Sequence, residues 1–156
     1  MFFRSRALIM RLTKMSRCGT RAIFDIAYHS VGIPVSAKVI SHRQEIPLKF
    51  LGQILNKLRQ ANIVKSKQGP RGGYILAREP NRIMVGDIIK AMKEPTDIVF
   101  CVDNPTKCKR AKQCVTRLVW KEAAEKINKL FDSVSIGDLC KKGERERFKK
   151  KYETVI

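Results

Sequence analysis

The sequence is short of acidic residues and of long apolar runs. It has 14 Asp and Glu against 33 Lys and Arg, which gives a net charge of +19 over 156 residues. Such an excess of one sign predicts a polyanionic partner, and nucleic acid fits it better than a membrane does. No stretch stays apolar for long enough to span a bilayer. The first ten residues carry two arginines and are too short for a secretory signal, so we expect a cytoplasmic protein.

Histidines and closely paired cysteines are also scarce. His29 and His42 are the two histidines, and neither has an obvious acidic or nucleophilic partner, so the sequence does not predict an enzyme. It has none of the Cys-x-x-Cys pairs that are typical of structural zinc sites. In a cytoplasmic chain the five cysteines are expected to be ligands or redox thiols rather than disulfides.

The first half of the chain carries the pattern of a helix, a tight turn and a second helix. Residues 16–30 have helical periodicity, and the Gly32-Ile33-Pro34 stretch ends that helix. Ser36 is a favoured N-cap for a short helix over residues 37–43, in which Val39 and Ile40 are expected to be buried.

A third helix and a hairpin follow. Pro47 suits the first turn of a helix, and leucines then recur at helical spacing to form an apolar face, at Leu48, Leu51, Leu55 and Leu58. Two short strands are predicted at 63–64 and 74–76, with a basic, glycine-rich tip over 65–73 between them. This order predicts a mostly α fold with a small β-hairpin wing, that is, a winged helix-turn-helix.

The charge and polar pattern of this half favours DNA binding. Residues 10–90 hold 15 basic and 4 acidic residues, so they account for +11 of the net charge. The third helix can enter the major groove, where Lys49, Gln53 and Asn56 are the candidates for base contacts. Phosphate or minor-groove contacts are expected from Ser36, Lys38, Lys65, Lys67 and Arg71. The alternative is a solvated amphipathic helix followed by an ordinary turn.

The second half begins with a small strand predicted at 81–84 and a short helix at 85–92. The longest helix is predicted over 115–134, with an apolar seam at spacings of four and three. The seam consists of Trp120, Ala124, Ile127, Phe131 and Val134. A seam of this kind predicts dimerisation, although the helix could instead pack on its own domain. Ser135 and Asp138 form a capping box for a short terminal helix, and the charged residues after it are expected to fray.

Cys101, Cys108 and Cys114 lie on one loop, separated by six and five residues. Several lysines and arginines lie close to them in the sequence, and nearby positive charge favours the thiolate form that binds metals. Three such thiols fit an iron–sulfur cluster with a fourth ligand from elsewhere, although a metal-free thiol switch also fits. Cys18 and Cys140 lie on apolar helix faces and are expected to be small core residues.

Five stretches together resemble the Rrf-two family of winged-helix transcription regulators. They are RLTKMSRCGTRAI at 11–23, IPLKFLGQILNKLRQANIVKS at 46–66, GPRGGY at 69–74, VGDIIKAM at 85–92 and CVTRLVW at 114–120. The resemblance implies a homodimer on near-palindromic double-stranded DNA, with a [2Fe-2S] or [4Fe-4S] cluster on Cys101, Cys108 and Cys114. It also implies that the signal is iron, redox, nitric oxide or sulfur status. A cluster-free regulator, or an interaction module that acts with a cysteine-biosynthesis enzyme, is the alternative.

The chain departs from the family pattern at several positions. Arg117 stands where cluster-biogenesis regulators have a histidine ligand, and Arg17 stands where nitric-oxide sensors have an acidic ligand. The adjacent Cys18 is a speculative substitute for the fourth ligand. Gly52 and Gln68 replace a glutamate and an arginine of the reading helix and wing, so an operator sequence should not be transferred.

These observations divide the chain into five segments. We expect an N-terminal extension at 1–9, the winged helix-turn-helix at 10–95, the cysteine loop at 96–114, the dimerisation helix with a short terminal helix at 115–140, and a basic tail at 141–156.

Overall fold

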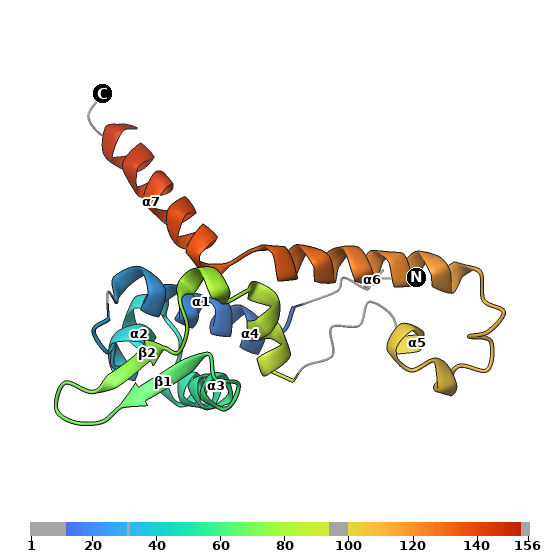
Figure 1. Cartoon of the computed structure of the whole chain (residues 1–156), viewed down its shortest axis with the longest axis horizontal. Coiled ribbons are helices and arrows are strands. Elements are labelled where there is room, and N and C mark those ends of the chain that lie inside the picture. The colour runs from blue at the N-terminus through green and yellow to red at the C-terminus, as the bar shows by residue number, and fades with distance from the viewer. Residues whose placement is uncertain (1–11, 31, 94–99, 154–156) are drawn as a thin grey trace, which may run out of the picture.

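The computed structural model describes residues 12–30, 32–93 and 100–153 (Figure 1). Its first helix, α1 (Lys14–His29), begins at Thr13, whose side chain accepts a hydrogen bond from the Ser16 N–H. α2 (Ala37–Gln44) begins at Ser36, whose hydroxyl oxygen accepts from the Val39 N–H, as the sequence predicts. α3 (Leu48–Gln60) follows Pro47. The helix-turn-helix order is therefore confirmed, and the bounds differ from the predicted ones by one or two residues.

Residues 12–30 and 32–93 form the part of the molecule that is called the head from here on. Its core lies between α1, α3 and α4 (Val85–Ala91). The apolar face of α3 buries Leu51, Ile54, Leu55 and Leu58 completely. The predicted burial of Val39 is wrong, because Val39 is 44% exposed. Leu48, the first residue of the predicted apolar face, is 45% exposed. Leu48 is the first residue of its helix, and Val39 lies about 100° around α2 from the buried Ile40, which turns it away from the core.

The wing consists of β1 (Val64–Lys67) and β2 (Gly73–Leu76), which pair antiparallel with Lys67 opposite Gly73. The strands run further into the basic segment than predicted, so the loop is only Gln68 to Gly72. A single bridge joins Val35 to Tyr74, with N···O distances of 2.9 and 2.8 Å. This bridge ties the wing to the residue just before the N-cap of α2.

The segment predicted as a strand at 81–84 is instead a 3-10 turn, η1 (Pro80–Arg82), followed by a single bridge between Met84 and Ser135. Because Pro80 lacks an N–H, the chain turns there instead of continuing as a strand. The bridge brings the junction after α6 (Thr116–Ser133) onto the start of α4.

The cysteine loop carries more local structure than the sequence indicates. It contains a one-turn helix, α5 (Phe100–Asp103), and a 3-10 turn, η2 (Pro105–Lys107). The expected loop begins at residue 96, and its first four residues lie outside the described part of the chain. α6 extends from the head for about 27 Å at ~1.5 Å per residue, and α5 lies beside its far end (Figure 1).

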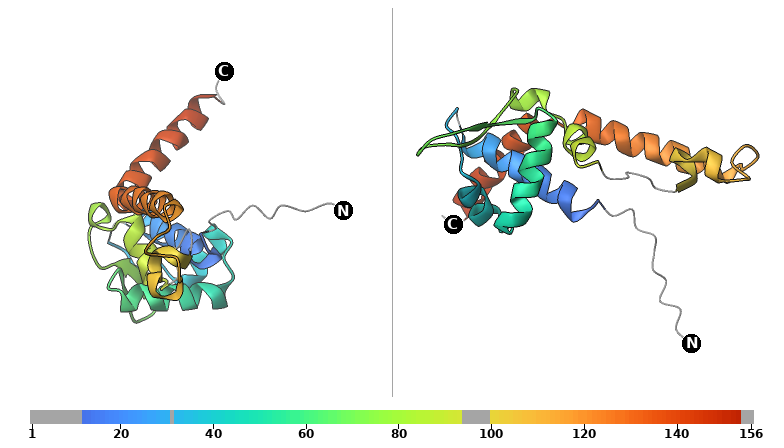
Figure 2. Two further views of the ribbon diagram at one scale, coloured as in Figure 1. Left: turned by 90° about the vertical axis from the view of Figure 1, so that its right-hand side faces the viewer. Right: turned by 90° about the horizontal axis from the view of Figure 1, so that it is seen from below.

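The chain ends in α7 (Ile136–Glu153). The Ser135–Asp138 capping box is confirmed, because the Asp138 N–H donates to Ser135 Oγ at 3.0 Å and the Ser135 N–H donates to Asp138 Oδ2 at 3.0 Å. The expected short terminal helix and frayed tail are wrong, since one helix runs from Ile136 to Glu153. Its first turns pack on α1, where Gly143 lies against the rings of Phe24 and Tyr28. α7 leaves the head on the side away from α3 (Figures 1 and 2).

Candidate DNA interface and cysteine loop

The outer face of α3 is an exposed polar strip. Lys49, Gln53 and Asn56, the predicted base-contact residues, are all exposed and lie on the same side of the helix. The opposite face is fully buried, so the backbone of α3 is held rigidly under this strip. Gly52 lies within it, and a Cβ added there would meet nothing within 4 Å. The fold therefore does not need a glycine at this position, which leaves room for a close approach to a groove.

Arg59 is a further member of this strip; the sequence places it on the polar face of the helix, but it was not among the predicted base-contact residues. Arg59 is exposed, and its Nη2 donates to Asn56 Oδ1 at 3.1 Å. The bond occupies the Asn56 carbonyl oxygen and leaves the two N–H donors of the amide without a part in it. The spacing of three residues on a helix was the available signal, because side chains three apart are neighbours.

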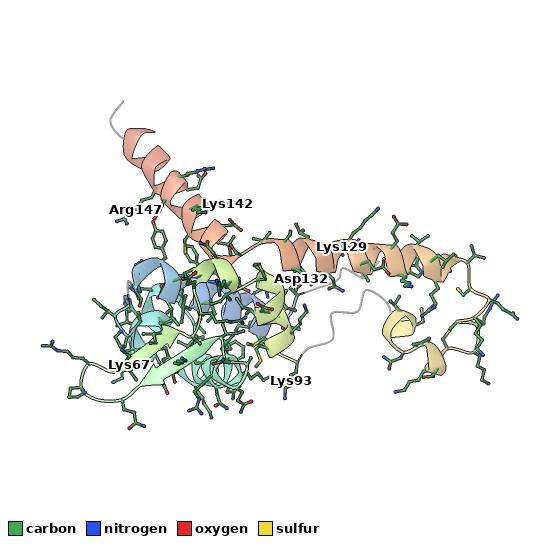
Figure 3. All side chains as sticks on the ribbon, in the orientation of Figure 1. Lys67, Lys93, Lys129, Asp132, Lys142 and Arg147 are labelled. Carbon is green, nitrogen blue, oxygen red and sulfur yellow. The ribbon has the colours of Figure 1, made fainter. Side chains whose placement is uncertain are left out.

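The basic side chains of the wing, Lys65, Lys67 and Arg71, are all exposed. Figure 3 shows Lys67 on the wing, on the other side of the head from Lys142 and Arg147 of α7. Gly73 has a φ of 155°, and a Cβ there would collide with the backbone of Val35 and Ser36. The glycine is thus required for the contact that holds the wing beside the start of α2. Ser36 and the exposed Lys38 lie at that start, as a phosphate-binding role requires.

A buried carboxylate fixes α2 relative to α1. Asp25 is fully buried, and its two oxygens accept from Arg43 Nη2 at 2.8 Å and from Gln44 Nε2 at 2.9 Å. Arg21 donates in turn to the side chain and the backbone carbonyl of Gln44. The cluster lies at the end of α2, where the chain turns into α3. This cluster was not among the sequence predictions, although an acidic residue between Ile23 and Ile26 on an apolar helix face indicates a buried, paired carboxylate.

The three loop cysteines are free and half-buried, and they come from three separate places. Cys101 is on α5, Cys108 follows η2, and Cys114 lies two residues before α6. A hydrogen bond with Thr116 Oγ1 at 3.2 Å, aided by backbone N–H groups of the first turn of α6, lowers the pKa of the Cys114 thiol. Within the described residues no three Cys, His, Asp or Glu side chains form a group that could hold a metal ion. The three thiols are therefore suitable ligands for a thiolate-bound cluster, but they would have to move closer together to bind one.

The two remaining cysteines are placed differently. Cys18 is only 6% exposed and packs in the core of the head, as a small apolar residue does. As a fourth ligand, Cys18 would have to bring this buried thiol to the loop of another subunit, and its speculative assignment to that role stays a prediction. Burial raises the pKa of the Cys140 thiol, which keeps it protonated and unreactive.

α6 carries an apolar stripe that is open to solvent. None of its residues is buried, and Trp120 is 42% exposed. The stripe includes four of the five predicted seam residues, and at ~100° per residue it also includes Val119, Ala123 and Leu130. The fifth seam residue, Val134, follows the last residue of the helix in extended conformation. Near the head, Phe131 lies beside Gly86 and Ile89 of α4. Within the described residues, α4 packs on this end of α6 and α5 packs on its far end, and the stripe between them is exposed or half-buried.

The joint between α6 and the head is tightly built. Lys90 Nζ lies 2.9 Å from Asp132 Oδ1 and 3.2 Å from Oδ2. Gly86 packs so closely on Asp132 that a Cβ would overlap its carboxylate. Backbone bonds of 2.9 Å also join Val85 N to Val134 O and Ile136 N to Ile83 O. The direction of α6 is therefore fixed relative to α3 and the wing.

A polar third helix, a basic wing tied to the second helix and a helix-turn-helix core define a winged helix-turn-helix DNA-binding regulator. Comparison with known proteins agrees. The chain belongs to the Rrf2 family: the family model described as "Rrf2: Iron-dependent Transcriptional regulator" matches residues 12–142. The family consists of transcription regulators, so the chain is a DNA-binding regulator and not an enzyme.

Individual relatives cover most of the chain. It is 37% identical over 135 residues to the HTH-type transcriptional regulator IscR of Xenorhabdus nematophila, which covers 86% of this chain and 82% of the relative. It is 39% identical over 132 residues to protein rrf2 of Nitratidesulfovibrio vulgaris, covering 85% and 88%. The solved structure of T. potens IscR superposes with a TM-score of 0.73 at 36% identity, covering 87% and 90%. That of CymR, the global cysteine regulator of B. subtilis, gives 0.70 at 28% identity, covering 84% and 96%.

No helix in the described part of the chain is both long enough and apolar enough to cross a bilayer.

Proposed function

We propose that this chain is a homodimeric transcription regulator that reads DNA with α3 and the wing. We further propose that it senses iron, redox, nitric oxide or sulfur status through an iron–sulfur cluster on Cys101, Cys108 and Cys114. The observation that carries the proposal is the construction of α6. Its near end is fixed to the DNA-reading head, its far end holds the cysteine loop, and the apolar stripe between them is exposed or half-buried in the described part of the chain.

This stripe supports dimerisation. Large side chains such as Trp120 and Leu130 lose contact with water when two such helices pack together, which favours association. A second copy of the chain is the natural occupant, because a two-fold dimer presents two identical reading heads to a near-palindromic site. Since each α6 is fixed to its own head, the angle at which the two helices cross sets the distance between the two α3 helices.

The cysteine loop supports cluster binding through its donor set. Three free thiols, one of them with a lowered pKa, lie among basic side chains at one end of α6. A cluster bound to these thiolates would join the three cysteines to one another. Loss of iron, oxidation or reaction with nitric oxide would then break or modify that connection. The protein itself holds Cys101 and Cys114 beside the first turn of α6. A movement of the loop would therefore act on the helix that sets the distance between the two heads.

A cluster-free thiol switch is the second candidate. It is favoured by one observation, namely that the three thiols are not gathered into one group in the described residues. It uses the same loop and the same helix, and it differs in having no metal.

The cluster assignment predicts a clear loss on changing one ligand. The Cys108→Ser variant, purified without oxygen, is expected to lose most of its iron and its visible absorption, because three thiolates cannot hold a cluster once one is removed. Cys140→Ser is the matched control, since that thiol lies outside the loop, and it should keep both signals. Full iron and sulfide content in Cys108→Ser would remove Cys108 from the ligand set. A colourless, iron-free parent protein would favour the thiol switch.

The DNA interface predicts different signatures for wing and helix. Lys67→Ala should weaken specific and random duplexes about equally and lower the slope of log affinity against log salt by about one unit, because it loses a phosphate contact. Gln53→Ala should cost roughly 1–3 kcal/mol on the operator only, because it loses a base contact. Fluorescence anisotropy over a salt series, with an operator selected from random duplexes, measures both effects.

Lys129→Ala is the control for charge alone, because Lys129 is an exposed lysine on α6, away from the wing (Figure 3). It should leave the salt slope unchanged. If Lys67→Ala weakened only the operator while Gln53→Ala weakened both duplexes equally, the roles given to the wing and the helix would be exchanged.

A further inference from the structure

Arg117 connects the two ends of the cysteine loop. From the first turns of α6 its Nε donates to the Cys101 carbonyl at 2.9 Å, and its Nη2 lies 3.3 Å from the Val102 carbonyl. Its backbone N–H donates to the Cys114 carbonyl at 3.2 Å. One residue therefore contacts the backbone of two of the three loop cysteines, which are 13 positions apart in the sequence.

The loop needs such a contact because it has almost no core. Of residues 101, 102 and 104–115, only Ala111 is buried. α5 is a helix of four residues, too short to be stable by itself, and the carbonyls at its end lack helical partners. A guanidinium satisfies two of these carbonyls at once with its fixed fork of donors, and its charge suits the negative end of a helix.

The side chain of Arg117 does not have the chemistry of a metal ligand. A guanidinium stays protonated and has no acceptor, so the residue cannot itself be a metal ligand. Its two side-chain bonds instead go to carbonyls of the segment that carries a thiol. Its contribution to the site is to place Cys101, not to bind the metal.

We propose that Arg117 is a positioning residue that holds the Cys101 segment against the start of α6 before any metal binds. The loop is then partly assembled by protein contacts alone, and loading of the cluster requires only the remaining convergence of the thiols. This inference rests on the proposed function for its metal, but the contact itself belongs to the metal-free chain. Losing the cluster would accordingly leave the loop attached to α6 at the Cys101 end.

Hydrogen exchange of the metal-free, full-length protein tests the contact. In Arg117→Ala, the peptide amides of residues 101–106 are expected to exchange at least ~10-fold faster than in the parent. The segment can then open without first breaking the hydrogen bonds from the Arg117 side chain to the Cys101 and Val102 carbonyls. Arg117→Lys should fall between the two, since one ammonium cannot bond both carbonyls in the same geometry. Arg110→Ala is the matched control, because it removes the same charge from an exposed position of the same loop.

Anaerobic loading with ferrous iron and sulfide supplies the second readout. Arg117→Ala should take up the cluster roughly 10-fold more slowly than the parent. Arg110→Ala also removes a positive charge near Cys114, so it measures the effect of charge alone and should slow loading clearly less than Arg117→Ala does. Exchange and loading that are both unchanged in Arg117→Ala would overturn the inference. If the parent protein takes up no iron, the proposed function fails, and the exchange result then decides the positioning role alone.

Discussion

Replacing Ile127 by Glu is expected to turn the protein into a monomer that binds its operator very weakly. Ile127 lies at the middle of the apolar stripe of α6, and burying an unpaired carboxylate there costs several kcal/mol. A monomer reads only one half-site, so we expect affinity to fall by about 1,000-fold, or ~4 kcal/mol at tenfold per 1.4 kcal/mol. Light scattering and operator titration measure the two effects.

Leu118→Glu is the matched control for this variant. Leu118 is 64% exposed, and it lies nine residues from Ile127, which places it about 180° around the helix. The substitution makes the same change of size and charge off the stripe, so the dimer should survive. A dimer that persists in Ile127→Glu would place the interface on another surface, and a Leu118→Glu monomer would show that the stripe is not the contact.

The head was predictable because its signals are local. The Ser36 N-cap, the leucine spacing of α3, the glycine-rich wing and the Ser135–Asp138 capping box each act over a few residues, and the structure has all of them. The same local rules misjudged Val39, because the exposure of a residue on a short helix depends on which other elements pack on it.

The structure of α7 shows how tertiary contact overrides a charge pattern. Residues 141–151 are mostly charged, and such a run by itself predicts a solvated, frayed segment. The first turns of α7 are instead anchored on α1, with Gly143 against Phe24 and Tyr28, and on η1, where Gly137 lies against Asn81. A helix nucleated in this way can extend through the charged residues, because propagation costs far less than nucleation.

The candidate sites were predictable as residue types but not as contacts. The spacing of the loop cysteines indicates a thiol site, yet it does not show that Arg117 reaches the Cys101 carbonyl. Likewise the polar face of α3 indicates a reading helix but not the bond between Arg59 and Asn56 across one turn. Side-chain rotamers and the approach of separate segments decide these contacts, and neither is encoded in spacing alone.

The largest loss of folding stability is expected from Arg43→Ala. This change leaves the Asp25 carboxylate buried without the cation that lies 2.8 Å from it. Breaking a buried ion pair from one side costs roughly 3–5 kcal/mol. Because the Arg43 side chain is 31% exposed and Gln44 still donates to Asp25, we expect ~3 kcal/mol here. Thermal unfolding should show a midpoint lower by roughly 6–12 °C, at ~2–4 °C per kcal/mol.

Arg82→Ala is the control for losing an arginine from an ion pair. Arg82 and Glu79 are 79% and 77% exposed and 3.9 Å apart, so this variant should lose about 0–1 kcal/mol. The double variant Asp25→Asn/Arg43→Ala separates the causes. If the stranded charge is what destabilises Arg43→Ala, neutralising Asp25 should recover part of the loss, because no buried charge remains. If the stability losses of Asp25→Asn and Arg43→Ala simply add up in the double variant, then Arg43 acts through packing alone and the charge of Asp25 does not contribute to the effect.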